Sequence, residues 1–319
     1  MTRKSNDNGR SFEFACMMEL KQQIELHRKV SIIKNQYFYD VEKTFHDNSE
    51  DFQKSLLKSA KVAVEVIFEL EPLIIEDGTD ELELAFQSDH AGEEGDVRDI
   101  LIVRRHLKWE IGLSLKHNHT AAKHPRLSAS LDFGKKWYNI PCSDEYWKKV
   151  IPVFDYLKEE KGKGTLWSEL PNKEEDVYVP LLESFKAELE RAYKEDPTLP
   201  KRLVSYILGK YDFYKVISFE SKNEVDVLPF NLRGSLNQRD HSETEHRKRI
   251  LEISRLPTEI VAIKYKSNSR STLELYMNNG WQFSFRIHNA EHAVKASLKF
   301  DVQIEGMPAT IMSIHRKWN

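Results

Sequence analysis

The sequence contains little cysteine and no long hydrophobic run. Its 319 residues include two cysteines, Cys16 and Cys142, which is too few for a disulfide framework or a four-cysteine zinc site. No apolar run approaches the roughly 20 residues of a membrane-spanning helix. The first residues, MTRKSNDNGR, lack the apolar core of a signal peptide. We therefore expect a protein of the reducing cytoplasm, with no membrane partner.

The chain also lacks an excess of positive charge, since its formal net charge is −3. A nucleic-acid partner is not excluded by this, because a DNA-binding groove needs positive charge only where the phosphate backbone lies. Hydrophobic residues make up 40% of the chain and charged residues 31%, as in a globular protein. The basic side chains are clustered at residues 104–106, 116–126, 246–249 and 315–317.

The most informative stretch is GDVRDILIVRRHLKWEIGLSLK, residues 95–116, which predicts two strands joined by a basic turn. Asp99 opens the first strand. In the second, alternation places Glu110, Ser114 and Lys116 on one face, opposite an apolar stripe. We expect Asp99 and Glu110 to hold a hard divalent cation such as Mg²⁺. Lys116 would polarise a phosphate or the attacking water, which is the chemistry of metal-assisted phosphodiester hydrolysis.

The alternative for this stretch is a buried hairpin with scattered surface charges. Asp99 could simply cap its strand, and Glu110 could pair with Arg104 or Lys108 on the surface. Asp96 competes with Asp99 for any role as a metal ligand, but an acid that directly precedes an apolar strand is favoured here.

The segment that follows, HNHTAAKHPRLS, is dense in groups that donate hydrogen bonds to phosphates and bases. It contributes six candidate DNA contacts: His117, Asn118, His119, Lys123, His124 and Arg126. An HNH nuclease motif is a poor alternative, because that motif spreads its residues over a ββα unit. Zinc is also disfavoured, since these histidines have no cysteine nearby to complete a ligand set.

Periodicity along the chain predicts a mixed α/β fold. Helices are expected at residues 11–33, 51–70, 144–158, 180–195 and 200–210, and a strand at 81–86. The segment Lys161–Gly164 is the best candidate for a flexible join. We therefore expect a helical N-terminal part and catalytic core over 1–160. Residues 161–319 would form a helical and β-rich region for DNA recognition and dimer contacts. One integrated domain is the alternative.

Near the C-terminus the pattern predicts a β-hairpin. Residues 272–277 and 281–288 alternate around Asn279-Gly280, a pair suited to a two-residue turn. The outward face of the second arm carries Arg286 and His288, followed by Asn289. Arginine and asparagine read guanine and adenine edges in the major groove, so these three residues are candidate base contacts. An ordinary solvated face is the alternative.

An Asp followed by Glu-x-Lys on adjacent strands is the signature of the PD-(D/E)xK nuclease superfamily, and residues 99–116 resemble it. This chain carries Ser114 where the usual acid stands, two residues before Lys116. Some restriction endonucleases of the superfamily have Ser-x-Lys and recruit the acid from elsewhere. Glu110 is our first candidate for it. Glu13, in the first turn of the N-terminal helix, is the second, with Arg10 as a phosphate or base contact.

The wider sequence resembles the HaeIII-type restriction endonucleases. The matching segments, in order, are SNDNGRSFEFA, GDVRDILI, WEIGLSLKHNHTAAKHPRLS, GKYDFYKVI and GWQFSFRIHNAEHAVKASLKFDV. The resemblance implies a type II restriction endonuclease with a mixed-sheet PD-(D/E)xK core, cutting double-stranded DNA at GGCC with Mg²⁺. Because the site is a palindrome, a homodimer is expected. Two alternatives stay open: a repair or recombination nuclease with little specificity, and a DNA-binding protein without catalysis, hinted at by Ser114.

Overall fold

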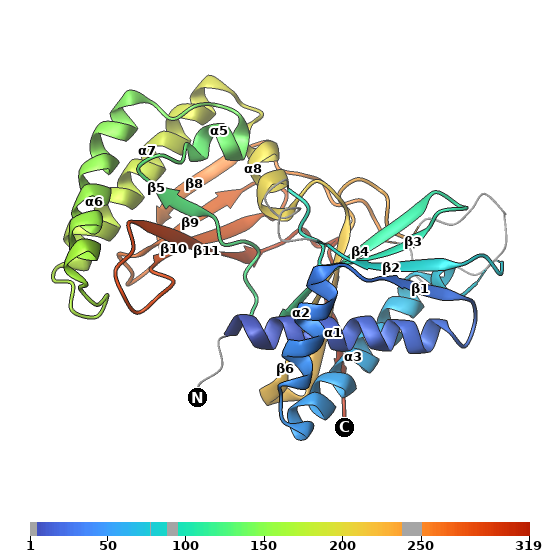
Figure 1. Ribbon diagram of the computed structural model, residues 1–319. Helices are drawn as coiled ribbons and strands as arrows, with labels where there is room; N and C mark the ends of the chain where they lie inside the picture. Colours follow the sequence, from blue (N-terminus) through green and yellow to red (C-terminus); the bar gives the residue numbers. More distant parts are fainter. Residues whose placement is uncertain (1–4, 77, 88–94, 238–250) are drawn as a thin grey trace. The chain divides into compact units, whose positions relative to one another are not determined.

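The computed structural model describes residues 5–76, 78–87, 95–237 and 251–319 (Figure 1). The basic cluster expected at 246–249 lies outside these residues. The chain divides into two compact units, described separately below. Unit 1 comprises residues 1–120, 209–254 and 309–319, and unit 2 comprises 121–208 and 255–308. Within the described ranges, no helix is both long and apolar enough to cross a membrane.

The division does not coincide with the boundary expected at residue 160. The chain passes from unit 1 to unit 2 after Thr120 and returns at Gly209. The expected join, Lys161–Gly164, is instead the end of helix α6 (Asp144–Lys163) inside unit 2. Gly164 has a left-handed backbone conformation with φ of 76° and caps the C-terminal end of that helix. Glycine is common at this position because it has no Cβ atom, so its presence does not require a linker.

Unit 1 is built on a seven-stranded mixed sheet in the order β1-β2-β3-β4-β6-β7-β12. The pairs β1–β2 and β4–β6 are parallel, and the other neighbours are antiparallel. This confirms the mixed α/β fold. Its strands are β1 (Val30–Ile33), β2 (Leu82–Phe86), β3 (Ile100–Arg104), β4 (Trp109–His117), β6 (Phe213–Phe219), β7 (Glu224–Phe230) and β12 (Ile314–Lys317).

Helices α1 (Ser5–Ile24), α2 (Gln36–His46) and α3 (Glu50–Leu70) and the short η1 (Pro72–Ile74) belong to the same unit. Helix α1 contacts β4, and α3 contacts β7 and β12. The first helix was expected to extend to residue 33, but α1 ends at Ile24 and residues 30–33 form strand β1. Helix α2 was not expected from the sequence; Asn35 caps it by accepting a hydrogen bond from the backbone N–H of Phe38.

The two faces of the seven-stranded sheet differ in polarity. Leu113, Leu115 and Val216 belong to the hydrophobic core that α1 and α3 complete. Side chains alternate along a strand, so Ser114, Lys116 and Lys215 project from the opposite face. This polar face carries the candidate site.

Unit 2 has a five-stranded antiparallel sheet in the order β5-β11-β10-β9-β8. Its strands are β5 (Arg126–Ser128), β8 (Ile260–Tyr265), β9 (Thr272–Met277), β10 (Gln282–His288) and β11 (Ser297–Gly306). Its other helices are α5 (Phe133–Tyr138), η2 (Glu174–Tyr178), α7 (Val179–Glu195) and α8 (Leu199–Leu208). The β9–β10 hairpin confirms the prediction, with positive φ at both Asn279 and Gly280.

Aromatic rings join the helices to this second sheet. Phe185 of α7 contacts Phe285 of β10 and Phe300 of β11, with ring centroids 5.2 and 4.8 Å apart. Trp137 of α5 packs against the same two rings. The helices therefore cover the apolar face of the sheet, and the alternate residues of β10 and β11, including Arg286, lie on its other face.

Candidate active site

Asp99 and Lys116 lie together at the ends of two paired strands of unit 1. The backbone N–H of Asp99 donates to the carbonyl oxygen of Leu113 at 2.7 Å, which extends the β3–β4 pairing by one residue. The Oδ2 atom of Asp99 accepts hydrogen bonds from the backbone N–H of Leu115 at 2.6 Å and from Lys116 Nζ at 3.3 Å. Both side chains remain about a quarter exposed, 25% and 28%. They are therefore held in place and accessible to a ligand.

Glu13 is a second carboxyl group whose charge interacts with Asp99 and Lys116. It is buried in α1, and its Oε2 accepts a hydrogen bond from the hydroxyl of Tyr37 in α2 at 2.7 Å. Burial, and then the negative charge of Asp99, raise the pKa of Glu13 to about 8, while Tyr37, Lys116 and Arg10 act in the opposite direction. The two carboxyl groups and the Lys116 ammonium therefore interact, although they come from distant parts of the sequence.

Arg10 lies beside this pair, with its guanidinium 5.6 Å from the centre of the Tyr37 ring. A cation over an aromatic face at this distance is weakly attracted to it. Arg10 thus belongs to the surroundings of Glu13. Its contact with a phosphate or a base remains a prediction.

The structure does not bring Glu110 next to Asp99. Glu110 lies four residues before Ser114 on β4, a separation of roughly 13 Å along a strand. Its carboxylate accepts a hydrogen bond from Arg98 Nη1 at 2.7 Å. Alternation along β4 places Glu110 on the same face as Ser114 and Lys116, as predicted. The distance along the strand, however, separates Glu110 from Asp99.

Asp96 belongs to the same ion-paired group as Glu110. Its Oδ1 accepts from Arg98 Nε at 2.8 Å, and its Oδ2 accepts from Arg98 Nη2 and Gln87 Nε2 at 2.7 Å each. The Arg98 side chain crosses directly over Gly112, where a Cβ atom would come within 2.1 Å of Arg98 Cδ. Asp96 and Glu110 therefore hold Arg98, and Gly112 provides the space it occupies.

Ser114 and Lys215 extend the polar face across the sheet. Ser114 is buried and pairs in register with Lys215 on the parallel strand β6. Lys215 Nζ donates to the carbonyl oxygen of Thr120 at 2.5 Å. Burial, and then the charge of Lys116, lower the pKa of Lys215 to about 7. The sequence analysis did not identify Lys215. The pattern that could have indicated it is a single lysine within the otherwise apolar strand segment FYKVI, residues 213–217.

Three of the six residues expected to contact DNA after Lys116 belong to unit 1. His117 is buried against the rings of Phe12 and Phe52, and this burial lowers its pKa. Asn118 has a positive φ of 53°, and its Oδ1 accepts a hydrogen bond from the backbone N–H of Glu220 at 2.9 Å. The third residue, His119, is half-buried and lies one residue before the end of the first segment of unit 1, 1–120.

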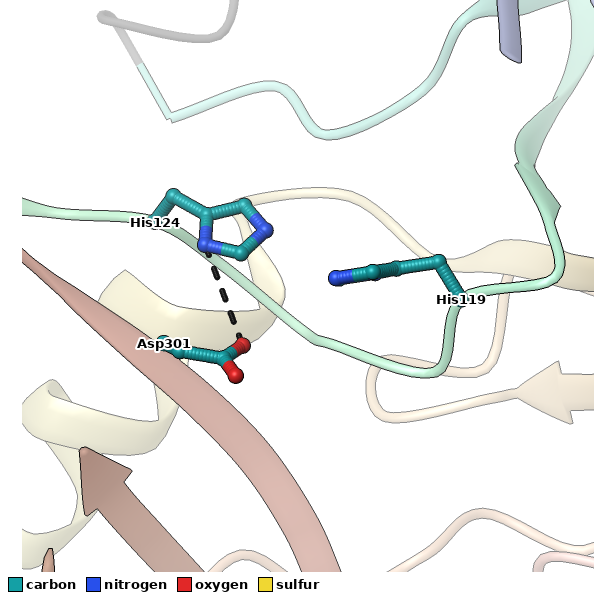
Figure 2. A group of neighbouring side chains, drawn as sticks. All are labelled: His119, His124 and Asp301. Atoms are coloured by element: carbon teal, nitrogen blue, oxygen red, sulfur yellow. Dashed lines mark ion pairs between the residues drawn. The ribbon is translucent and has the colours of Figure 1, made fainter. Parts of the chain in front are cut away.

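The other three belong to unit 2. Lys123 Nζ donates to the Tyr206 carbonyl oxygen at 2.8 Å, lies over the Tyr206 ring, and has its pKa lowered to about 8 mainly by burial. Arg126 is exposed and donates to Ser297 Oγ at 2.6 Å. His124 Nδ1 lies 3.8 Å from Asp301 Oδ1 (Figure 2). The basic segment, continuous in sequence, is thus divided between two units.

The polar face of β10 carries the remaining candidates. Arg286 is 56% exposed and pairs with Asp301 Oδ2 at 3.0 Å. The His288 ring lies 6.0 Å from that of His124. The amide of Asn289 donates to the carbonyl oxygens of Glu291 and Ala293 at 2.5 and 2.7 Å, so it holds the turn after β10. Arg286 is the best placed of the three for an external ligand.

Among the described residues of unit 1, we consider two sets of side chains that have the donors for a metal ion. In the first, the Glu13 and Asp99 carboxyl groups repel each other when ionised, and a hard divalent cation between them would offset that repulsion. The residues therefore fit a hard divalent cation. The second set is Glu224, Asp226 and His315, where β7 pairs with β12. It lies two strands away from β4 and is separate from Asp99.

Comparison with known proteins shows the family of the chain. Residues 9–308 match the family model of the HaeIII restriction endonuclease. The chain is 46% identical to the type II restriction enzyme HaeIII of Haemophilus aegyptius over 319 residues, covering 100% of this chain and 99% of the relative. No solved structure matches the chain. The predicted resemblance is confirmed: the chain belongs to the HaeIII restriction endonuclease family and is a site-specific deoxyribonuclease.

Proposed function

We propose that this enzyme cuts both strands of DNA at GGCC in a Mg²⁺-dependent reaction, and that it acts as a homodimer. The observation that carries the chemistry is that Asp99 and Lys116, partly exposed at the ends of β3 and β4, interact with each other and with the buried Glu13 of α1. GGCC is supported by the family resemblance. The homodimer is supported by the two-fold symmetry that a palindromic target imposes on the protein that reads it.

Asp99 and Glu13 would hold the cation. Their orientation is set before it binds, since the Leu115 N–H fixes one carboxylate and the Tyr37 hydroxyl fixes the other. When bound, the cation supplies a Lewis acid for a phosphate oxygen and lowers the pKa of a water molecule. Glu13 must be ionised to act as a ligand, so it has to release its proton when the cation enters.

Lys116 would hold positive charge beside the scissile phosphate. Charge increases on the phosphate oxygens in the transition state, and a fixed ammonium there stabilises it more than the ground state. Asp99 keeps the ammonium in place at 3.3 Å. Ser114 has no charge to offer the cation, so we assign the part of the usual second acid to Glu13.

One experiment tests the proposal as a whole. The protein is incubated with a bacterial genomic DNA in Mg²⁺, and the termini of the products are sequenced. We expect blunt ends cut in the middle of GGCC. Asp99→Asn, purified in parallel, controls for contaminating nucleases and should leave the DNA intact. Ends at another fixed sequence would overturn the assigned site, and ends at random positions would overturn restriction specificity.

The oligomeric state is tested separately. Sedimentation of the protein with a GGCC duplex should give a complex of two chains per duplex. One chain per duplex, with both strands still cut, would contradict the homodimer.

A further inference from the structure

Asp301 joins two polar side chains on the five-stranded sheet of unit 2. It lies on β11, directly opposite Arg286 of β10 in the strand register. Its Oδ2 accepts a hydrogen bond from Arg286 Nη2 at 3.0 Å, and its Oδ1 accepts one from Gln303 Nε2 at 2.7 Å. Gln303 is two residues further along β11, so it projects from the same face of the sheet. The carboxylate of Asp301 is therefore held from two sides.

The two members of the Arg286–Asp301 pair differ in exposure. The Asp301 side chain is 11% exposed, whereas the Arg286 side chain is 56% exposed. An arginine that is held by a neighbouring carboxylate loses less conformational freedom when it binds a ligand, because part of its orientation is already set. Arg286 is therefore accessible to a ligand and oriented before the ligand arrives.

The charge of this pair favours a base over a phosphate as the ligand. A phosphate is bound largely through positive charge, and a carboxylate 3.0 Å from the guanidinium offsets that charge. The directional N–H donors of the arginine are not offset in this way. Guanine presents two acceptors, N7 and O6, on its major-groove edge, and their spacing matches the donors of a guanidinium. A guanine edge is therefore the ligand that fits this arginine.

We propose that Asp301 is a positioning residue for DNA specificity, which orients Arg286 toward the major-groove edge of a guanine and weakens the attraction of Arg286 to the phosphate backbone. The inference rests on the proposed function, because it requires a DNA target that contains guanine. It deepens that function by naming a residue that acts on specificity through Arg286.

An ion pair that only holds β10 to β11 is the competing explanation. Such a pair has a small effect on folding stability, and its loss affects all DNA sequences alike. A positioning carboxylate has a different signature, because its removal acts on cognate and random DNA in opposite directions. The cognate complex loses an oriented base contact, while the random complex gains a phosphate contact from the released arginine.

The main variant is Asp301→Asn, which keeps the size of the side chain and removes its charge. Arg286→Lys is the second variant, since it keeps the charge at an exposed position without the planar set of donors. Glu175→Gln is the matched control, because it removes the acid from another arginine pair of unit 2, Arg270 with Glu175. Melting temperatures are measured alongside to check that each variant folds.

Two quantities are measured for each variant. The first is the ratio of single-turnover cleavage rates on the cognate duplex and on duplexes in which one G·C pair is replaced by A·T. The second is the affinity for random DNA without divalent metal, over a range of salt concentrations.

We expect Asp301→Asn to lower the cleavage ratio at one G·C position by about tenfold to 100-fold, the usual value of a bidentate arginine–guanine contact. It should also raise the affinity for random DNA and steepen its salt slope by about 0.9, since one more phosphate is neutralised. Arg286→Lys should lower the ratio to the same extent without steepening the slope. Glu175→Gln should leave both quantities unchanged.

The double variant Asp301→Asn/Arg286→Ala tests whether the two residues act together. Adding Arg286→Ala should remove the steeper salt slope and lower the cleavage ratio little further, because the two residues serve one contact.

An unchanged cleavage ratio with Asp301→Asn or with Arg286→Lys would overturn the proposal, as would weaker binding of Asp301→Asn to random DNA. Asp301 would then be a structural partner of Arg286. Failure of the proposed function gives a different result, since the wild-type enzyme itself would then cut all of these duplexes at equal rates or leave them all intact.

Discussion

The hydroxyl of Tyr37 donates a hydrogen bond to Oε2 of Glu13, 2.7 Å away. This contact fixes the carboxyl group of a buried acid on α1 from a second helix, α2, close enough to Asp99 for the two acids to affect each other's charge. Ser114 occupies the place of the usual acid, and we propose that Glu13 supplies the second carboxylate for a divalent cation.

Glu13→Gln should therefore abolish cleavage more completely than Glu110→Gln. Loss of a carboxylate ligand should reduce the single-turnover rate by at least about 10²-fold, whereas Glu110 only pairs with Arg98. Glu19→Gln on the same helix is the control. Rates are measured over a range of Mg²⁺ concentrations. If Glu110→Gln is inactive and Glu13→Gln is not, the second acid is Glu110.

The free protein should also carry a pH signature of Glu13. Its pKa is raised to about 8, so the folded state holds a proton that the unfolded chain has lost above its ordinary value of 4.5. This contribution to stability is complete below that value and is lost as the pH rises through 8. Glutamine stays neutral. The melting temperature of Glu13→Gln, relative to wild type, should therefore increase between pH 5 and 8 in a chelating buffer.

A constant difference between the two proteins over that pH range would mean that Glu13 is not protonated in the folded state. Glu71, whose pKa burial raises to about 7, is present in both proteins and cancels in the comparison.

Lys116→Met should abolish cleavage and leave specific DNA binding within about tenfold of wild type, because the ammonium acts mainly on charge that develops in the transition state. Cleavage rate and equilibrium affinity are measured on the same duplex. Turnover close to that of the wild type would remove Lys116 from the mechanism.

Gly112→Ala should destabilise unit 1 by about 1–3 kcal/mol, the usual cost of forcing an extra group into a filled position. The new methyl group would meet Arg98, which Asp96 and Glu110 hold in place. Denaturant unfolding provides the measurement. Combining Gly112→Ala with Arg98→Ala should cost less than the sum of the two changes. Strict additivity would show that Arg98 moves aside freely.

Arg286→Ala should weaken binding to the cognate duplex by about 1–3 kcal/mol and have little effect on random DNA, if its exposed guanidinium reads guanine. Arg270→Ala is a matched control, since Arg270 is 55% exposed and also pairs with one acid, Glu175. Binding curves on both DNAs decide the question. Equal weakening on cognate and random DNA would assign Arg286 to the phosphate backbone.

The sequence by itself determined the local elements of this protein. The β3–β4 pair with Asp99 and Lys116 at one end follows from alternation and a short turn, and the β9–β10 hairpin follows from Asn279-Gly280. Both depend on contacts between residues that are near in the chain. The resemblance to the HaeIII family was also readable, since its matching segments run in order along the sequence.

Only the tertiary structure decided which charged groups meet. Glu13 and Lys215 reach Asp99 and Lys116 because α1 packs on β4 and because β6 pairs with β4 in one particular register. No local pattern encodes that packing or that register. Glu110 lies on the same face of β4 as Lys116 but too far along the strand to reach Asp99, and its carboxylate pairs with Arg98 instead. Periodicity predicts the side of a sheet on which a residue lies, whereas long-range packing decides what it touches.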